Sequence, residues 1–473
     1  MNPVEISSEQ FRRLADRITS LASEHLEKLD SKPIAPPATG AETVRLFQSA
    51  MPEQGIGEQA LDLLPEVIRC SRAQNGRFFA YVLGSGESVA ATADLLASVL
   101  NQNATAWRSG PAAMAIEQTV VGWLAQAIGC QGFRGHLTGG GSPANLMGLA
   151  MAREAKVPAN EKGTAANGVV YASEEVHMSI PKSVALLGLG RENLRLIPTD
   201  DSFRMNTDEL ERKLLVDKET GKVPIAIVAS AGTVNTGAID PLRKIAEIAH
   251  RHNAWFHIDG AYGALAAIAD PDKFHGLELA DSISLDPHKW LYQPLDCGCL
   301  LYRSSKAEQR AFSHSGDYAR VLNADPVEGF AFFEESIELS RRFRSLKLWL
   351  SLRYHGLAAF RESIRNDLDH AQRLAQAIRD HSHLELMAPV ELSAVCFRHR
   401  MLGGTSEQRV NEFNAAVLKR VVQRGRVYLS NATLRGKFCL RACFVNHRTK
   451  DEDVDTIIPE IEAATIDLSN SGF

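Results

Sequence analysis

The sequence predicts an α/β protein: a large domain with a mostly parallel sheet, followed by a smaller α+β domain. Between about residues 85 and 305, short apolar runs alternate with helical patterns. Strands that are apolar along their whole length are buried on both faces, and their alternation with helices is typical of a parallel sheet. After about residue 385, short strand patterns surround one helical stretch, which predicts the second domain.

The first 75 residues predict helices rather than part of the sheet. Ser7 and Gln10 form a capping-box pattern. Four apolar residues then share one helix face: Phe11, Leu14, Ile18 and Leu21. Prolines at 33, 36 and 37 end this helix, and a second helical stretch covers about 57–73. We expect these helices to embrace a second subunit, with packing on the large domain as the alternative.

Six apolar runs in the large domain are predicted strands: Gly168–Ala172, Leu194–Pro198, Ile225–Ser230, Trp255–Asp259, Ser282–Leu285 and Gly298–Tyr302. Helical patterns separate most of them: Val176–Leu187, Thr207–Leu215 and Leu242–His252. Ligands of such sheets bind at the carboxyl ends of the strands. Residues just after those ends are therefore the first candidates for a functional site.

A long helix, Leu346–Arg361, leads out of the large domain. The segments after it predict four strands and a helix: strands Leu384–Met387, Ser393–Arg398, Arg426–Leu429 and Lys437–Phe444, and helix Glu407–Arg424. We therefore expect three parts: an N-terminal helical segment (1–75), a large domain (76–350) and a small α+β domain (351–473).

Composition limits the functions open to the chain. Its 473 residues carry 52 basic and 57 acidic side chains, and the formal charge of −5 argues against nucleic-acid or membrane partners. Seven cysteines are typical of a reduced protein, and the C-x-C pair Cys297 and Cys299 has no second pair at zinc spacing. The start of the chain lacks signal-peptide features, and no apolar run is long enough to span a bilayer. We expect a cytoplasmic protein without a metal site.

Lys289 lies in the strongest local signal, Ser-Leu-Asp-Pro-His-Lys-Trp at residues 284–290. A predicted strand ends there in a turn, with the lysine between a histidine and a tryptophan. At the carboxyl end of a strand, among apolar and cationic neighbours, burial favours the neutral amine that acts as a nucleophile. The alternative is an ordinary surface lysine.

Asp259 ends another predicted strand, and the small residues Gly260 and Ala261 follow it. An acid with no basic partner nearby in the sequence needs a buried partner or a cationic ligand. A pyridinium nitrogen would serve, and the small residues would let a flat ring approach the backbone.

Glycines 139–141, followed by Ser142 and Pro143, lead into a helical stretch. Such a turn exposes free N–H groups at the positive end of a helix dipole and can bind an anion. The pattern matches neither the dinucleotide nor the nucleoside-triphosphate glycine motif. His177 lies at the start of another predicted helix. Its ring would have a role in the site if a ligand ring could stack against it.

Pyridoxal 5′-phosphate is one ligand that accounts for all four features. Lys289 would bind its aldehyde, and Asp259 would keep its ring nitrogen protonated. The turn at residues 139–142 would bind its phosphate, and His177 would stack on its ring.

At these residues the chain resembles the pyridoxal-phosphate-dependent group II decarboxylases, which act on aromatic amino acids, glutamate and cysteine sulfinate. The resemblance covers about residues 75–445 and is most specific at Asp-Pro-His-Lys-Trp, residues 286–290. The segment Arg341–Lys347 resembles the aromatic branch. The family implies a fold-type I, aspartate-aminotransferase-like architecture. It also implies a homodimer with active sites at the subunit interface.

The resemblance assigns the cofactor residues one by one. It implies that Lys289 binds the cofactor covalently, that Asp259 contacts the ring nitrogen, and that His177 and Ala261 pack on the ring. Further cofactor contacts are implied for Gly140, Gly141, Ser142, Thr233, Asp286 and His288. Tyr318 matches the mobile-loop tyrosine that protonates the substrate carbon after carbon dioxide leaves, and His177 is the alternative donor.

The resemblance also implies four substrate contacts: Tyr81, Asn103, Thr105 and Arg441. Arg441 matches an arginine placed to meet a carboxylate. Two departures affect the substrate side: Asn75-Gly76 replaces His-Pro of many members, and Asp286 replaces the asparagine usual in aromatic decarboxylases. The segment 103–105 is also smaller and more polar than in the plant and animal aromatic enzymes.

The predicted reaction is α-decarboxylation of an L-amino acid, with an aromatic substrate favoured by the family. Aspartate, glutamate or diaminobutyrate stay open as substrates. An aldehyde synthase is a second alternative, disfavoured because such enzymes tend to carry phenylalanine where this chain has Tyr318. A lyase for a phosphorylated substrate would need a further basic phosphate site, and a non-catalytic cofactor-binding homologue would not need the full residue set.

Overall fold

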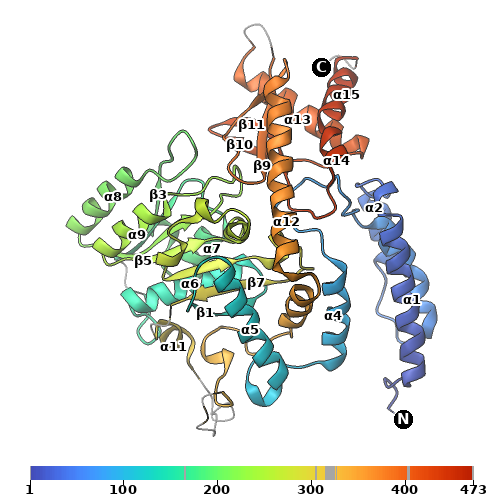
Figure 1. Cartoon of the computed structure of the whole chain (residues 1–473), viewed down its shortest axis with the longest axis horizontal. Coiled ribbons are helices and arrows are strands. Elements are labelled where there is room, and N and C mark those ends of the chain that lie inside the picture. Colours follow the sequence, from blue (N-terminus) through green and yellow to red (C-terminus); the bar gives the residue numbers. More distant parts are fainter. Residues whose placement is uncertain are drawn as a thin grey trace.

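A computed structural model describes residues 2–164, 167–303, 306–314, 325, 327–401 and 405–470 (Figure 1). The described residues form a large α/β unit around a seven-stranded sheet, a smaller unit around a four-stranded sheet, and N-terminal helices beside them. Among the helices described, none has the length and apolar character needed to cross a membrane.

The large sheet has the strand order β1-β7-β6-β5-β4-β2-β3. Its strands are β1 Arg134–Thr138, β2 Gly168–Ser173, β3 Leu194–Ile197, β4 Val223–Ser230, β5 Trp255–Asp259, β6 Ser282–Leu285 and β7 Gly298–Tyr302. Strands β3, β2, β4, β5 and β6 pair in parallel, and β7 pairs antiparallel with both β6 and β1. The predicted fold class, a mostly parallel α/β sheet with a small C-terminal α+β unit, is confirmed.

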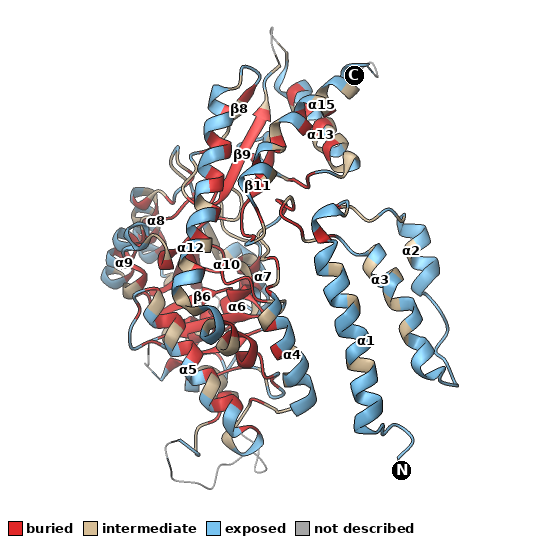
Figure 2. Cartoon of the chain, turned by 45° about the vertical axis from the view of Figure 1, so that its right-hand side comes forward, coloured by how far each residue is buried: buried red, intermediate tan, exposed pale blue. Residues whose placement is uncertain are grey.

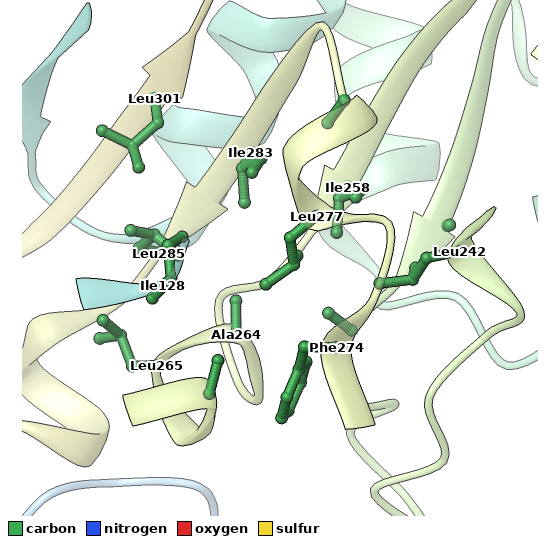
Figure 3. Packing of buried hydrophobic residues seen from close by; sticks show 14 of the residues in the cluster. Ile128, Leu242, Ile258, Ala264, Leu265, Phe274, Leu277, Ile283, Leu285 and Leu301 are labelled. Atoms are coloured by element: carbon green, nitrogen blue, oxygen red, sulfur yellow. The ribbon is translucent and has the colours of Figure 1, made fainter. Parts of the chain in front are cut away.

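Helices lie on both faces of this sheet: α5 Pro111–Ala127, α6 Gly141–Lys156, α7 Ser179–Leu186, α8 Thr207–Glu219 and α9 Leu242–Arg251. Three further helices of this unit are α4 Ser88–Leu100, which packs on the long helix Ser345–Asp380, α10 Pro287–Trp290, which follows β6, and α11 Ala307–Phe312, which packs on α6. Strand β4 shows why the runs are apolar throughout. Ile227 and Ala229 pack in one cluster with α5 and α9, whereas Ala226 and Val228 pack in another with α6 and α7. Figure 3 shows part of the first cluster.

The small unit contains an antiparallel sheet of order β10-β11-β9-β8. Its elements are β8 Leu384–Leu386, β9 Ala394–His399, α13 Glu407–Arg424, β10 Ser430–Leu434, β11 Lys437–Cys443, α14 Asp451–Asp455 and α15 Ile457–Asn470. The predicted strand Arg426–Leu429 is wrong. Its Tyr428 makes an isolated bridge to Phe78, and the strand that pairs with β11 begins only at Ser430.

Helix α12, Ser345–Asp380, joins the two units and extends well past the predicted end at Arg361. It is interrupted at Gly356, whose φ of 75° lies in the left-handed region. Glycine adopts that conformation without steric cost, so the chain can bend there and continue as helix.

The N-terminal helices are α1 Ser8–Glu27, α2 Gly40–Phe47 and α3 Leu64–Cys70, with a 3₁₀ helix, Gly57–Leu63, before α3. The predicted capping box is confirmed, since Ser7 Oγ accepts from the N–H of Gln10 at 3.2 Å and Gln10 Oε1 accepts from the N–H of Ser7 at 2.9 Å. None of α1, α2 and α3 contains a buried residue, and they stand apart from the rest of the chain (Figure 2).

Candidate active site

A cavity of about 440 Å³ lies where strands β4, β5 and β6 end. This volume is within the range of small-molecule sites. Twelve residues singled out in the sequence line it: Tyr81, Gly140, Gly141, Ser142, His177, Thr233, Asp259, Ala261, Asp286, His288, Lys289 and Arg441. Residues more than 350 positions apart in the chain are thus brought to one edge of the sheet, as expected for a sheet of this kind.

Lys289 lies on the short helix α10, which follows β6 directly. Its Nζ is 2.9 Å from Oδ2 of Asp286, and its side chain is mostly buried. The ring of His288 is fixed by a 2.8 Å contact between Nδ1 and the carbonyl oxygen of Cys297. The amine can act as a nucleophile only after this pairing with Asp286 is given up.

Asp259 ends β5 and is 7% exposed. Its Oδ1 accepts from the hydroxyl of Ser284 and the N–H of Ala261, each at 3.2 Å, and its Oδ2 accepts from the amide of Asn145 at 3.0 Å. These donors satisfy the acid as a carboxylate, which is the form that would hold a proton on a pyridine nitrogen.

His177 precedes α7 and faces the same cavity. Burial lowers the pKa of its imidazole below the ordinary value of 6.5. The ring is therefore neutral at neutral pH and can lie against a flat, electron-poor ring without bringing a positive charge.

The glycine turn before α6 is shaped for a close approach. Gly140 has a φ of 130°, a conformation that residues with a side chain rarely adopt. A Cβ added to Gly141 would lie 2.6 Å from the Cβ of Ala261 and 3.1 Å from Oδ2 of Asp286. The N–H groups of Gly141 and Ser142, at the start of α6, have no intrahelical acceptors, so they can bind the oxygens of an anion.

The residues present fit pyridoxal 5′-phosphate. Lys289 can bind an aldehyde, the carboxylate of Asp259 matches a ring nitrogen, and the turn before α6 matches a phosphate. One buried atom is left without a partner beside this turn: Oδ1 of Asp286. A carboxylate oxygen only accepts hydrogen bonds, so the oxygens of a phosphate would not satisfy this atom.

The whole chain matches known proteins of one kind. Residues 44–400 match the family model for the pyridoxal-dependent decarboxylase conserved domain. The chain belongs to this family. It is 33% identical over 474 residues to an aromatic-L-amino-acid decarboxylase of Bacillus atrophaeus, covering 99% of this chain and 98% of that protein. It is 30% identical over 462 residues to a phenylacetaldehyde synthase of Petunia hybrida, covering 92% and 90%.

A solved structure of Oryza sativa TDC with PLP and tryptamine superposes with a TM-score of 0.92 at 26% identity, covering 99% of each chain. The decarboxylase therefore uses pyridoxal 5′-phosphate, and its reaction class is amino-acid decarboxylation by a carboxy-lyase.

Two predicted residues of the decarboxylase, Asn103 and Thr105, are not among the lining residues of the cavity. Asn103 accepts from the backbone N–H of Arg341 through Oδ1 at 2.8 Å, and the carbonyl of Thr105 accepts from the N–H of Phe332 at 2.8 Å. Both therefore lie beside the segment that leads into α12. Tyr318 lies outside the described residues.

Two further residues of the decarboxylase belong to the site although the sequence did not single them out. Asn145 on α6 lines the cavity and donates to Asp259, and His257 on β5 contacts Asn145. His257 could have been noticed because it is a polar residue within a strand that is buried along its whole length. Asn145 was visible only as part of the motif that follows the glycine turn.

Proposed function

We propose that the enzyme converts an aromatic L-amino acid into the corresponding amine and carbon dioxide. The observation that carries this proposal is one cavity whose lining includes Lys289, Asp259 and Arg441. Tyr81, Val82 and Leu295 add apolar surface to the same lining. The names of the bacterial and plant relatives support the same substrate class. When bound, pyridoxal 5′-phosphate takes up the electron pair left by the departing carbon dioxide.

In this proposal, residues of the chain bind and orient both the cofactor and the substrate. Lys289 would hold the aldehyde of the cofactor through its ε-amine. Asp259, a carboxylate supported by three donors, keeps the proton on the ring nitrogen. His177, kept neutral because burial lowers the pKa of its imidazole, packs against the ring.

Arg441 is assigned to the substrate carboxylate. The side chain lies on β11, is 5% exposed, and is held by the carbonyl of Val234 and by Ser430 Oγ, the latter at 3.1 Å from Nε. A guanidinium has five N–H donors in a rigid fork, so these two bonds leave donors for a carboxylate.

The wall of the cavity favours an aromatic side chain over an acidic one. Among the described residues, Lys289 and Arg441 are the only lysine and arginine that line the cavity, and both already have roles. A second carboxylate on the substrate would be buried without a charged partner, which is costly. Tyr81 at the rim has a φ of 64°, and strain of this kind is typical of residues that touch ligands.

The proton that completes the amine is assigned to Tyr318, on the basis of the sequence alone. The oxidative reaction of an aldehyde synthase is the second candidate, because a phenylacetaldehyde synthase is among the relatives. The two reactions differ in whether the substrate carbon receives a proton or is oxidised by oxygen. Tyr318 favours protonation.

A homodimer completes the proposal, with residues 1–75 packing on the partner, residues 76–350 binding the cofactor and residues 351–473 forming the small domain. Large apolar side chains are exposed on α1, α2 and α4: Phe11, Ile18, Val44, Phe47, Leu96 and Val99 (Figure 2). Clustered exposed apolar side chains are typical of an interaction surface, and α1 and α2 contain no buried residue that would pack them on the rest of the chain. The cytoplasm is the proposed location, supported by seven unpaired cysteines.

Product analysis tests the function. The purified holoenzyme is incubated with tryptophan, tyrosine, dopa, phenylalanine, glutamate, aspartate and diaminobutyrate, and products are identified by mass spectrometry. We expect an aromatic amine with one equivalent of carbon dioxide. An acidic or diamino product would reject the aromatic assignment, and an aldehyde with ammonia would favour the oxidative reaction.

A further inference from the structure

A chain of buried polar side chains runs behind the wall of the active site. Trp255 Nε1 donates to Ser282 Oγ at 2.8 Å, and the same oxygen lies 2.8 Å from Nδ1 of His257. The other ring nitrogen, Nε2, lies 2.9 Å from Oδ1 of Asn145, whose amide nitrogen lies 3.0 Å from Oδ2 of Asp259. Each of these side chains is at most 7% exposed.

The two ends of this chain impose one direction on every hydrogen bond in it. The carboxylate of Asp259 only accepts, so the amide nitrogen of Asn145 faces it and Oδ1 faces His257. Nε2 of His257 must then carry the ring proton, which leaves Nδ1 to accept from the hydroxyl of Ser282. The indole N–H of Trp255 only donates, and it fills the acceptor position of that hydroxyl.

A second branch starts at the same amide. The nitrogen of Asn145 also donates to Ser179 Oγ at 2.9 Å, and that oxygen lies 2.8 Å from Nδ1 of His177. The backbone N–H of Ser179 donates to the same Nδ1 at 3.3 Å. Nδ1 of His177 therefore accepts, and the proton of this ring is on Nε2.

Helix α6 packs directly on this chain, so little room is left beside the intact side chains. A Cβ added to Gly148 would lie 2.7 Å from Cε1 of His257 and 3.3 Å from Ser282 Oγ. Burial lowers the pKa of His257 to about 4, so the ring is neutral at the pH of the cell. A neutral ring has one donor and one acceptor nitrogen, so its contacts allow only one orientation of the Asn145 amide.

We infer that the chain from Trp255 through His257 to Asn145 is a positioning device: it fixes one amide orientation, and that orientation holds both the carboxylate of Asp259 and the tautomer of His177. His257 is thus a positioning residue that never touches the substrate. The roles of Asp259 and His177 rest on the proposed function, whereas the direction of the chain rests on the contacts alone.

Two variants of His257 separate this role from simple packing. In His257→Gln the amide nitrogen reaches the place of Nε2 and can still donate to Asn145, whereas in His257→Asn it reaches only the place of Nδ1. Asn145 Oδ1 then loses its donor, and its amide can turn an oxygen toward Asp259. We expect the dissociation constant for pyridoxal 5′-phosphate, measured by fluorescence titration, to rise about tenfold or more in His257→Asn. In His257→Gln it stays within about threefold of the parent.

An equal loss of cofactor affinity in the two variants, or no loss in either, would overturn the inference. Thermal unfolding of both variants is measured alongside, because a packing defect lowers Tm without separating them in affinity.

A second measurement does not depend on variants that fold well. The holoenzyme is labelled with ¹⁵N in its histidine rings, and long-range proton–nitrogen spectra distinguish a protonated ring nitrogen from an unprotonated one. We expect His257 and His177 to carry their protons on Nε2. A proton on Nδ1 of His257 would overturn the inference and leave amino-acid decarboxylation untouched, whereas missing amine product would reject the proposed function without changing the tautomers.

Discussion

The ammonium of Lys289 lies 2.9 Å from Oδ2 of Asp286, while Oδ1 of the same carboxylate is buried without a hydrogen-bond partner. This carboxylate also borders the glycine turn, since a Cβ on Gly141 would lie 3.1 Å from Oδ2. A negative charge therefore lies between the lysine that binds the cofactor and the turn assigned to its phosphate.

Asp286→Asn should strengthen cofactor binding, because it removes a like charge beside the phosphate and frees the amine of Lys289. We expect the dissociation constant of pyridoxal 5′-phosphate to fall by about tenfold, equivalent to about 1.4 kcal/mol. Titration of the apoenzyme followed by absorbance measures it. Asp272→Asn makes the same charge change at an exposed side chain and serves as the control. Weaker binding in Asp286→Asn would mean that the carboxylate supports the cofactor rather than opposing it.

Substitution of Arg441 should weaken binding of the amino-acid substrate and leave binding of the amine product unchanged. Arg441→Gln removes the partner of the substrate carboxylate, so we expect KM for the amino acid to rise about tenfold to a hundredfold, with Arg441→Lys between it and the parent. The product amine has no carboxylate, so its inhibition constant should stay unchanged in both variants. If the amine binds as poorly as the amino acid, Arg441 shapes the cavity instead of recognising a charge.

The strands were predictable from the sequence where both of their faces are buried, because such strands are apolar along their whole length. Strands β5, β6 and β7 have the predicted bounds because each is an uninterrupted buried run. Strand β1, Arg-Gly-His-Leu-Thr, was not predicted, because His136 and an exposed Arg134 break the apolar pattern. It becomes a strand through its pairing with β7, which no local feature of the sequence encodes.

The site was predictable where single residues stand at the ends of strands. Lys289 and Asp259 follow or end β6 and β5, and they meet because parallel strands end at one edge. Asn145 and His257 act through partners on other elements, and nothing in their own segments indicates those partners. Asn103 was assigned by its position in a family motif, whereas in the folded chain its side chain contacts the backbone of Arg341.

Tyr318→Phe should change the product rather than the binding of the substrate. Without the phenol, the substrate carbon lacks its proton donor, and proton delivery by a positioned acid is worth about a hundredfold to ten-thousandfold in rate. We expect amine formation to fall and, in the presence of oxygen, aldehyde and ammonia to rise, as measured by chromatography. Unchanged amine output would transfer the role of proton donor to His177.

Acid should destabilise the enzyme before its carboxyl groups titrate. The pKa of His257 is about 4 in the folded chain and 6.5 as the ordinary value, so the unfolded chain binds more protons between these limits. The stabilisation is complete above pH 6.5 and is lost as the pH falls toward 4, for a total of about 3 kcal/mol. Urea-unfolding midpoints between pH 7 and 4.5 should fall more steeply in the parent than in His257→Gln. Equal slopes would contradict a neutral buried histidine at this position.

The covalent attachment of the cofactor at Lys289 tests the account most directly. The holoenzyme is treated with borohydride, which makes the bond between the cofactor and its lysine permanent, and is then digested and sequenced by mass spectrometry. We expect the pyridoxyl group on the peptide that contains Asp286 to Trp290, attached to Lys289, and no labelled peptide from Lys289→Ala. A label on another lysine, or the same label in the Lys289→Ala protein, would contradict the active site described above.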